Sequence, residues 1–277
     1  MTRFNRDGLN RTEKRDKKII VSLTSSPARI KGVPYTIASL LNQTMKPDKI
    51  ILWLGDDRFP DRKLPKIFDK LKACGVDIEF REDLGPHTKY YYAMKEFPED
   101  IVITFDDDWI YRNDLIEKMY KSYINHPSCV NCMQATKIAF LEDGSMGSDK
   151  KWDHRLISAD VESFRYSAIG VWGVLYPPHS VHEEIFNVEA IKKLCPKADD
   201  VWLKFMEVMK GFKVVSVGTE STGKNCIYGS QGKESLWIYN IANGGNDKQL
   251  KAVIEAYNNW TIESTGKTIL QLMWEDK

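Results

Sequence analysis

The sequence predicts an α/β fold with a mostly parallel central sheet, flanked by helices and followed by C-terminal helices. Through the first 110 residues, short apolar runs of strand length alternate with amphipathic segments of helix length. That alternation is typical of βαβ units. The run at 101–105 is nearly all apolar, so we expect a strand that is buried on both faces. A chain of 277 residues, 42% of them hydrophobic and 29% charged, can fill one large globular domain of this class.

Glycine, proline and polar residues mark the ends of the predicted elements. In the first half these elements are strands at 19–23, 49–54, 76–80 and 101–105, and helices at 33–43, 64–73 and 90–95. The second half is less regular. There we expect a helix at 113–123, a hairpin from 137–140 and the residues after Gly144, a mobile loop at 145–153, a strand at 168–176, a helix at 201–210, a strand at 212–217, a polar link at 218–233 and helices at 234–240 and 247–258.

Three consecutive carboxylates, Asp106, Asp107 and Asp108, follow the buried strand at 101–105. In open α/β sheets, ligands bind beyond the carboxyl ends of the strands. If the strand geometry continued, Asp106 and Asp108 would share one face and Asp107 would take the other. Two converging carboxylates repel each other unless a cation lies between them, and oxygen ligands suit Mg²⁺ or Mn²⁺. The stretch therefore predicts a divalent metal site. The alternative is a helix cap, a role for which Asn113 is better placed.

Composition excludes several classes of partner. A formal net charge of +1 makes nucleic acid an unlikely main partner. The five cysteines are odd in number and scattered, which favours a reducing, cytoplasmic setting. Cys129 and Cys132, near His126, resemble half a zinc site, but no second pair follows, so buried thiols are the better interpretation.

The ends of the chain and its hydropathy bear on membranes. No apolar run approaches the roughly 18 residues that a membrane span needs. Residues 1–17 are polar and mostly basic, so we expect a flexible N-terminus with weak attraction to an anionic membrane surface. The predicted location is cytoplasmic, and the basic N-terminus adds the prediction of contact with the inner face of the membrane.

Five stretches, taken in order, resemble GT-A glycosyltransferases of the bacterial surface-polysaccharide kind. The ordered set, spanning roughly residues 18 to 250, is more specific than the Asp triplet alone. The stretches are Ser-Leu-Thr-Ser-Ser-Pro-Ala-Arg-Ile at 22–30, Ser-Leu-Leu-Asn-Gln-Thr at 39–44 with Pro-Asp-Lys-Ile-Ile-Leu-Trp-Leu at 47–54, Gly-Pro-His-Thr-Lys at 85–89, the Asp triplet, and Tyr-Pro-Pro at 176–178 with Ala-Asp-Asp-Val-Trp-Leu at 198–203.

The resemblance implies a single GT-A domain over residues 18–277, with a donor-binding half at about 18–110 and an acceptor half at about 111–277. It implies metal-dependent transfer of a sugar from a nucleotide sugar, with a UDP-sugar as the preferred donor. The acceptor implied is a hydroxyl of a glycan or glycolipid in bacterial surface polysaccharide or lipooligosaccharide synthesis. The cofactor implied is Mn²⁺ or Mg²⁺, and the mechanism implied is inverting.

The resemblance also implies roles for individual residues. Thr24 and Arg29 match the nucleotide-holding turn, Asp56 a base-reading position, Lys89 a basic donor-side position, Asp106 the ribose or donor-sugar and metal role, Asp107 a donor-side position, Asp108 the metal role, and Asp199 with Asp200 the catalytic base. Asp199 is nearer the expected cap of the following helix, so Asp200 is the preferred base.

Each role has a structural alternative. Thr24 could satisfy a turn, Arg29 and Lys89 could be surface charges, Asp56 could end a strand, and Asp199 could cap a helix. His87 departs from the family pattern, which has a small residue there. His179 and His182 are either further metal ligands or ordinary surface histidines.

Two other functions fit the same pattern less well. The first is a non-catalytic carbohydrate or nucleotide-sugar binding protein, against which the intact metal and base candidates argue. The second is a metal-dependent nucleotidyltransferase, which also places Asp residues after a strand. That class needs a glycine-rich phosphate loop after the first strand, and residues 24–29 contain no glycine.

Overall fold

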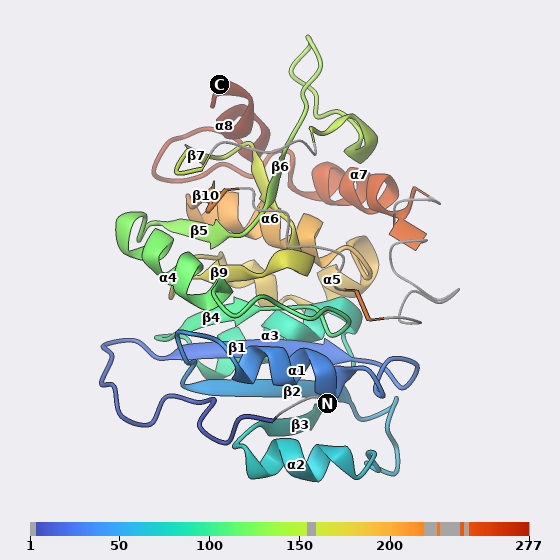
Figure 1. The fold of residues 1–277 in the computed structure, drawn as a ribbon. Coiled ribbons are helices and arrows are strands. Elements are labelled where there is room, and N and C mark those ends of the chain that lie inside the picture. The colour runs from blue at the N-terminus through green and yellow to red at the C-terminus, as the bar shows by residue number, and fades with distance from the viewer. Residues whose placement is uncertain (1–3, 154–158, 219–225, 228–238, 241–243, 277) are drawn as a thin grey trace.

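A computed structural model describes residues 4–153, 159–218, 226–227, 239–240 and 244–276. An eight-stranded sheet runs through it in the order β3-β2-β1-β4-β9-β5-β10-β7 (Figure 1). Its strands are β1 (Ile19–Ser25), β2 (Lys49–Gly55), β3 (Asp77–Arg81), β4 (Ile101–Thr104), β5 (Cys129–Cys132), β7 (Glu162–Ser163), β9 (Val174–Tyr176) and β10 (Lys213–Ser216). A second, two-stranded sheet pairs β6 (Ala135–Lys137) with β8 (Tyr166–Ala168).

Parallel pairing dominates the large sheet, which confirms the predicted fold class. β1 pairs in parallel with both β2 and β4, β2 with β3, and β5 with β10. β9 is inserted antiparallel between β4 and β5, and β7 is antiparallel to β10. The carboxyl ends of β1, β2 and β4 therefore meet at one edge of the sheet, the edge where ligands bind in such folds.

Helices cover both faces of the sheet (Figure 1). They are α1 (Val33–Leu41), α2 (Ile67–Ala73), α3 (Thr88–Glu96), α4 (Leu115–Asn125), α5 (Val188–Leu194), α6 (Asp199–Lys210), α7 (Gly245–Tyr257) and α8 (Ile269–Glu275). Successive β1 residues pack into the two hydrophobic cores on opposite faces of the sheet. Ile19 and Val21 pack on the side of α1 and α4, and Ile20 packs on the side of α3 and α6. This two-sided burial explains why β1, β2 and β4 are mostly apolar, whereas β3, which is only half-buried, alternates apolar and charged residues.

The predicted strand at 168–176 is wrong as a single element. β8 ends at Ala168, a 3₁₀ turn (Gly170–Trp172) follows, and β9 begins at Val174. Gly173 has φ 100°, and a Cβ there would lie 2.6 Å from the Phe105 ring. The turn therefore needs glycine both for its backbone conformation and for its close approach to Phe105.

A central strand was not predicted from the sequence. β5 is buried along its whole length, although it contains the polar Asn131. The Asn131 side chain is satisfied internally, because Ser122 donates to its Oδ1 at 2.6 Å and its Nδ2 donates to the Cys129 carbonyl at 2.8 Å. Cys129 and Cys132 are buried free thiols, as expected, and no described group of three or more His, Cys, Asp or Glu side chains could hold a metal.

The N-terminal segment has contacts with the rest of the fold. Over residues 4–17, which were expected to be flexible, the chain packs against the α1–β2 side of the fold. Phe4 and Leu9 contact the core. The Arg15 side chain is 9% exposed and donates to Asp48 Oδ2 at 3.0 Å. Buried apolar contacts and a partly buried ion pair therefore place residues 4–17 against the fold, and the flexibility of residues 1–17 stays a prediction.

Several of the remaining elements differ from the prediction, and the helix α5 and the short strand β7 were not predicted at all. α4 begins at Leu115 with Asp114 at the N-cap position, so neither Asn113 nor the Asp triplet caps it. The hairpin is present, with Phe140 opposite Met146, and the expected loop at 145–153 contains a short 3₁₀ turn and the buried Trp152. α8 was not predicted, and most of the helix expected at 234–240 lies outside the described residues.

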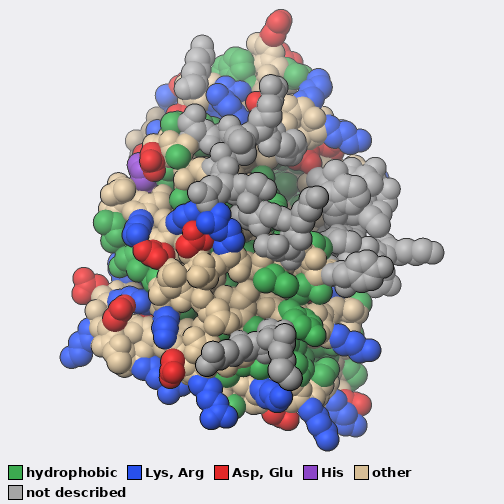
Figure 2. Space-filling model, in the orientation of Figure 1, with side chains coloured by type: hydrophobic (Ala, Val, Ile, Leu, Met, Phe, Trp, Pro, Cys, Tyr) green, Lys and Arg blue, Asp and Glu red, His purple; other side chains and the backbone are tan. Residues whose placement is uncertain are grey.

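Two surface properties complete the fold. In the described part of the chain, no helix is long and apolar enough to cross a membrane. Lys and Arg side chains are interspersed with Asp and Glu on the face seen in Figure 2, as the near-neutral net charge requires.

Candidate active site

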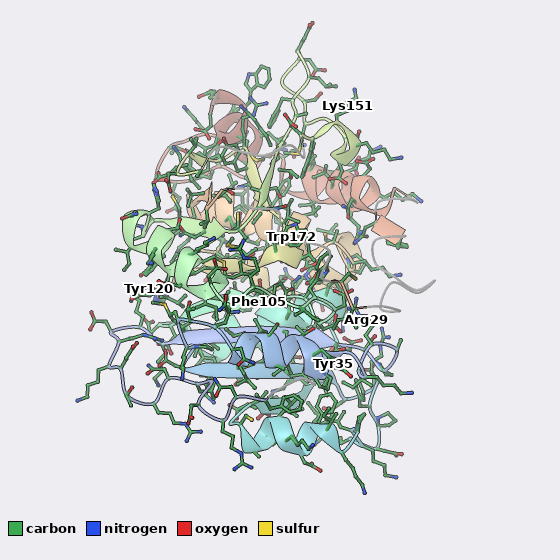
Figure 3. The ribbon with its side chains drawn as sticks, viewed as in Figure 1. Arg29, Tyr35, Phe105, Tyr120, Lys151 and Trp172 are labelled. Carbon is green, nitrogen blue, oxygen red and sulfur yellow. The ribbon has the colours of Figure 1, made fainter. Side chains whose placement is uncertain are left out.

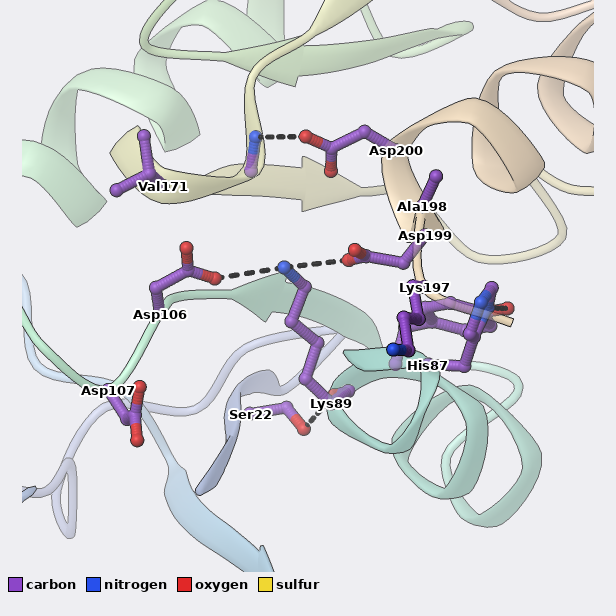
Figure 4. A network of polar contacts seen from close by, with 12 residues as sticks. Ser22, His87, Lys89, Asp106, Asp107, Val171, Lys197, Ala198, Asp199 and Asp200 are labelled. Atoms are coloured by element: carbon purple, nitrogen blue, oxygen red, sulfur yellow. Dashed lines mark hydrogen bonds and ion pairs between the residues drawn. The ribbon is translucent and has the colours of Figure 1, made fainter. Parts of the chain in front are cut away.

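The buried ammonium group of Lys89 connects two acidic loops at the carboxyl edge of the sheet. Lys89 lies in the first turn of α3, and its side chain is only 6% exposed. Its Nζ donates to Asp106 Oδ1 at 2.9 Å and forms an ion pair with Asp199 Oδ2 at 2.7 Å (Figure 4). Asp106 follows β4, whereas Asp199 begins α6. One cation therefore brings the β4 loop and the α6 N-terminus into a single site.

A second cation holds the other two acids of the triplet. Arg29 lies after the end of β1 (Figure 3). Its guanidinium is 3.0 Å from Asp107 Oδ1 and 3.6 Å from Asp108 Oδ2, and Ser25 donates a hydrogen bond to the other Asp107 oxygen. The predicted alternation of the triplet is therefore wrong. β4 ends at Thr104, so the acids lie in a loop in which Asp107 and Asp108 share a partner and Asp106 has another.

Tyr111 fixes the turn that carries Asp106. Its hydroxyl accepts from the Asp106 N–H at 3.0 Å and donates to the Val171 carbonyl at 2.9 Å. The acid loop is thereby fastened to the 3₁₀ turn before β9.

The same 3₁₀ turn contacts the second acid of α6. The Gly170 N–H donates to Asp200 Oδ2 at 3.1 Å. A Cβ on Gly170 would lie 2.7 Å from Asp200 Oδ1 and 3.0 Å from Lys89 Nζ, so only glycine leaves room for both groups. The break in the predicted strand at 168–176 thus brings a backbone donor to Asp200.

The two adjacent acids of α6 have opposite pKa shifts. Burial and the neighbouring Asp199 charge raise the pKa of Asp200 to about 7, against the opposing effect of Lys89. Burial would also raise the pKa of Asp199, but Lys89 and His87 outweigh it and hold that pKa below its usual value. Burial lowers the pKa of Lys89, but Asp106 and Asp199 raise it well above its ordinary range. Asp199 and Lys89 therefore form a charged pair, while Asp200 titrates near neutrality.

His87 ties the start of α3 to the loop before α6. It is fully buried, with Nδ1 2.7 Å from the Tyr90 hydroxyl and Nε2 2.6 Å from the Cys195 carbonyl. Burial lowers the pKa of His87 to about 4, so the ring is neutral at pH 7. In that form Nε2 donates to the carbonyl and Nδ1 accepts from the tyrosine. His87, which departs from the family pattern, is therefore a buried side chain that connects α3 with the loop before α6, next to Asp199.

The structure brings together seven of the nine residues to which the sequence assigned roles and leaves two elsewhere. Arg29, Lys89, Asp106, Asp107, Asp108 and the Asp199–Asp200 pair surround this edge of the sheet. Thr24 lies within β1 and donates to the Trp53 carbonyl at 2.9 Å. Asp56 pairs with Arg62 at 2.6 Å on the surface. Ser25, Tyr111 and Gly170 were not singled out. Ser25 lies inside the quoted 22–30 stretch, whereas only the fold reveals the other two.

The acid triplet suits a divalent cation by donor type. The carboxylates of Asp106 and Asp108 supply hard oxygen ligands, and Mg²⁺ is usually held by one or two carboxylates together with substrate phosphates. Two buried oxygens at this site, Asp107 Oδ1 and Asp199 Oδ2, accept no hydrogen bond, although each forms an ion pair. Buried acceptors of this kind call for a further donor, water or ion. Those oxygens belong to Asp107 and Asp199, and no described group of three or more His, Cys, Asp or Glu side chains could hold a metal. Asp106 and Asp108 therefore fit a metal by donor type alone, and substrate phosphates would have to supply further ligands.

A comparison with protein-family models decides the class. Residues 25–165, just over half of the chain, match the model of glycosyl transferase family 2. The chain belongs to this family. It is therefore a glycosyltransferase with a GT-A fold that takes sugar from a nucleotide-sugar donor. The matched range includes Arg29, Lys89 and the Asp triplet but ends before Asp199.

Solved structures resemble this glycosyltransferase only distantly. CMP:2-keto-3-deoxy-manno-octonic acid synthetase with CTP is 11% identical, with TM-score 0.46, over 76% of this chain and 92% of that one. TarS 1–349 of S. aureus with UDP is 13% identical, with TM-score 0.44, over 72% of this chain and 58% of that one. Glucosyl-3-phosphoglycerate synthase of Mycobacterium tuberculosis with Mn²⁺, UDP and phosphoglyceric acid is 14% identical, with TM-score 0.33, over 42% and 43%.

These structures do not bear on the function of this chain, because the identities and TM-scores are low. The chain spans 58% and 43% of the lengths of the two glycosyltransferases. No curated protein gives a significant match. The assignment rests on the family match.

Proposed function

We propose that this glycosyltransferase moves a sugar from a UDP-sugar to a hydroxyl of a glycan or glycolipid acceptor, with inversion and with Asp200 as the base. One observation carries the proposal. Lys89 pairs with Asp106 of the donor-side acid triplet and with Asp199 of the α6 pair, so donor loop and base loop form one site. A merely structural strand end needs no such connection.

The base assignment follows from the divided roles of the α6 acids. Asp199 stays ionised because the paired Lys89 cation lowers its pKa, whereas Asp200 has a pKa of about 7. A general base works best when its pKa lies near the operating pH, and neighbouring acids whose pKa values are pushed apart indicate which one exchanges the proton. The Gly170 N–H occupies Asp200 Oδ2, which leaves Oδ1 for the substrate.

The acceptor hydroxyl oxygen bonds to the anomeric carbon of the donor sugar while its proton passes to Asp200. The bond between that carbon and the diphosphate oxygen breaks, and the nucleoside diphosphate leaves with the bonding electrons. Negative charge grows on the leaving group, and the Lys89 and Arg29 cations lie at the edge of the sheet where such charge would develop. Asp106 and Asp108 would hold Mn²⁺ or Mg²⁺, which would neutralise part of the diphosphate charge.

We further propose one domain over residues 18–277. Residues 18–110 would bind the donor and residues 111–277 would shape the acceptor site. The acid triplet, Lys89 and Arg29 lie in the first half and the α6 acids in the second, in agreement with that division. The acceptor would be a bacterial surface polysaccharide or lipooligosaccharide, reached by weak contact with the inner face of the membrane.

Asp200→Asn tests the proposal, with Asp199→Asn as the matched neighbour. Loss of a general base costs roughly 10²–10⁴ in rate. Asp200→Asn should retain UDP binding with Mn²⁺ and lose at least about a hundredfold in sugar transfer. Because the base must be unprotonated, the parent's transfer rate should fall as the pH drops below about 7, and NMR of the product should show an inverted anomeric centre.

Several outcomes would count against the proposal. Full transfer by Asp200→Asn removes the base assignment, and retained configuration removes the mechanism. If the parent binds a UDP-sugar with metal but neither hydrolyses nor transfers it with any glycan acceptor, the chain acts as a binding protein.

A further inference from the structure

Two adjoining cavities lie far from the candidate active site. The first, about 260 Å³, is lined at its base by Phe97, Val102 and Tyr176. The second, about 630 Å³, is lined by Trp260 and the residues after it. Lys210 lines both, so the cavities adjoin at this side chain, and we call the two together the Trp260 groove.

The groove lies at the opposite edge of the sheet from the acid triplet. Its floor includes Val102 at the start of β4, whereas Asp106 follows the end of that strand. The length of α6 gives the distance between the candidate active site and the groove, because Asp199 begins the helix and Lys210 ends it. Eleven residue steps at 1.5 Å place the two ends about 16 Å apart. The groove is therefore a separate site and not an extension of the acceptor cleft.

Aromatic and apolar surfaces alternate with polar groups along the groove. Trp260 is 38% exposed and packs against the His182 ring at 5.2 Å and the Tyr257 ring at 6.1 Å, so the indole is held in place. The groove's charged side chains are of both signs. They are Asp100, Glu183, Glu263 and Lys210. Mixed charge beside a fixed aromatic ring suits a neutral ligand that has both apolar faces and hydroxyl groups.

A strained backbone marks the first cavity. His179 has φ 57°, and the Ser180 N–H donates to the Pro177 carbonyl at 3.3 Å, closing a turn with Pro178 at its second position. A positive φ at the third position of such a turn is normally given to Gly or Asn. The exposed contact between His179 Nε2 and Glu99, at 3.0 Å, is too solvated to offset that strain. Such outliers concentrate at functional sites.

Polar groups in the groove still have bonds to make. Ser180 is one of the residues around the first cavity, and its hydroxyl has no hydrogen-bond partner among the described residues but is shielded from the open space. His182 Nδ1 accepts from the Glu184 N–H at 3.1 Å, so the neutral ring carries its proton on Nε2. A ligand that offers both donors and acceptors would satisfy the groups that face the open space.

We propose that the Trp260 groove binds a carbohydrate chain, as a second glycan site separate from the transfer site. The apolar face of one sugar ring lies on Trp260. A neighbouring ring passes Lys210 into the first cavity, where its hydroxyls reach the exposed imidazole of His179. The site would retain a glycan on the enzyme while another part of the chain is at the active site. It rests on the groove's own geometry and does not depend on the donor, the metal or Asp200.

Binding to a microarray of bacterial surface oligosaccharides tests the site, with the strongest binder then titrated in solution. Binding should persist in saturating UDP and Mn²⁺. Trp260→Ala should weaken it about fivefold or more, because the stacking surface is lost. His179→Gly removes the imidazole and relieves the positive φ, so the variant should bind more weakly yet unfold at the same or a higher urea concentration.

Asp160→Gly is the matched control. Asp160 also has a positive φ, 60°, but does not line the groove. It should gain stability and bind the oligosaccharide like the parent. The site is overturned if no arrayed glycan binds the parent, if UDP with Mn²⁺ displaces the bound glycan, or if both Trp260→Ala and His179→Gly bind it with unchanged affinity.

Discussion

Replacing Lys89 by Met removes the cation between three carboxylates. Lys89 contacts Asp106 and Asp199 directly, and its charge also lowers the pKa of Asp200. Removing one partner of a buried ion pair typically costs about 3–5 kcal/mol, because the other charge stays buried without compensation. We expect a loss of that size in the free energy of unfolding at pH 8.

The loss should shrink as the pH falls. Asp199 has a depressed pKa in the folded parent, so its pairing with Lys89 stabilises the fold above the unfolded pKa of a carboxyl group. Without Lys89 the carboxyl pKa values rise, and protonation relieves the repulsion in acid. The difference between variant and parent should therefore fall by up to about 1.4 kcal/mol per pH unit for each affected carboxylate.

Urea unfolding at pH 5 and pH 8 measures both effects. Lys49→Met is the matched control, since Lys49 pairs with Asp77 at the surface with both side chains about 40% exposed. Its loss should stay below about 1 kcal/mol and depend little on pH. If Lys89→Met does not fold at pH 8, the double variant with Asp199→Asn should recover stability. Parent-like stability of Lys89→Met at pH 8, or an equal loss at both pH values, would refute the charged cluster.

Three further predictions follow from single contacts. Asp108→Asn should abolish the Mn²⁺-dependent part of the thermal shift that UDP produces, and a shift with unchanged metal dependence would remove Asp108 as a ligand. Gly8→Ala should destabilise the fold by about 1–3 kcal/mol, because its Cβ would lie 2.5 Å from the Leu41 carbonyl oxygen; a neutral result in urea unfolding would show that the N-terminal segment is loosely held. Between pH 6.5 and 4 the free energy of unfolding of the parent should fall by up to about 1.4 kcal/mol per pH unit, because His87 takes up a proton in the unfolded chain but, with its depressed pKa, not in the folded one. His87→Gln should remove this part of the pH dependence.

Local patterns predicted the elements of the first half because β1, β2 and β4 are buried on both faces, β3 alternates apolar and charged residues, and each helix ends near a glycine, a proline or a polar residue. The same reasoning missed β5, where Asn131 interrupts the apolar run and its side-chain oxygen is satisfied by Ser122 of α4. It also joined β8 and β9, because the sequence does not show that Gly173 must approach Phe105. α8 carried a readable signal: Thr268 and Gln271 form a capping box at its start.

The candidate site shows the same division between local and long-range information. Residue type and position after a strand were enough to single out the Asp triplet and the α6 acids. The argument that chose between Asp199 and Asp200 was local and failed, because Ala198 is the N-cap residue and both acids lie in the first helical turn. What separates them is Lys89, 110 positions before Asp199 and paired with it, together with Gly170, which hydrogen-bonds Asp200. Asp200 remains the proposed base for a different reason: Lys89 holds the pKa of Asp199 below its usual value, whereas burial and the Asp199 charge raise the pKa of Asp200.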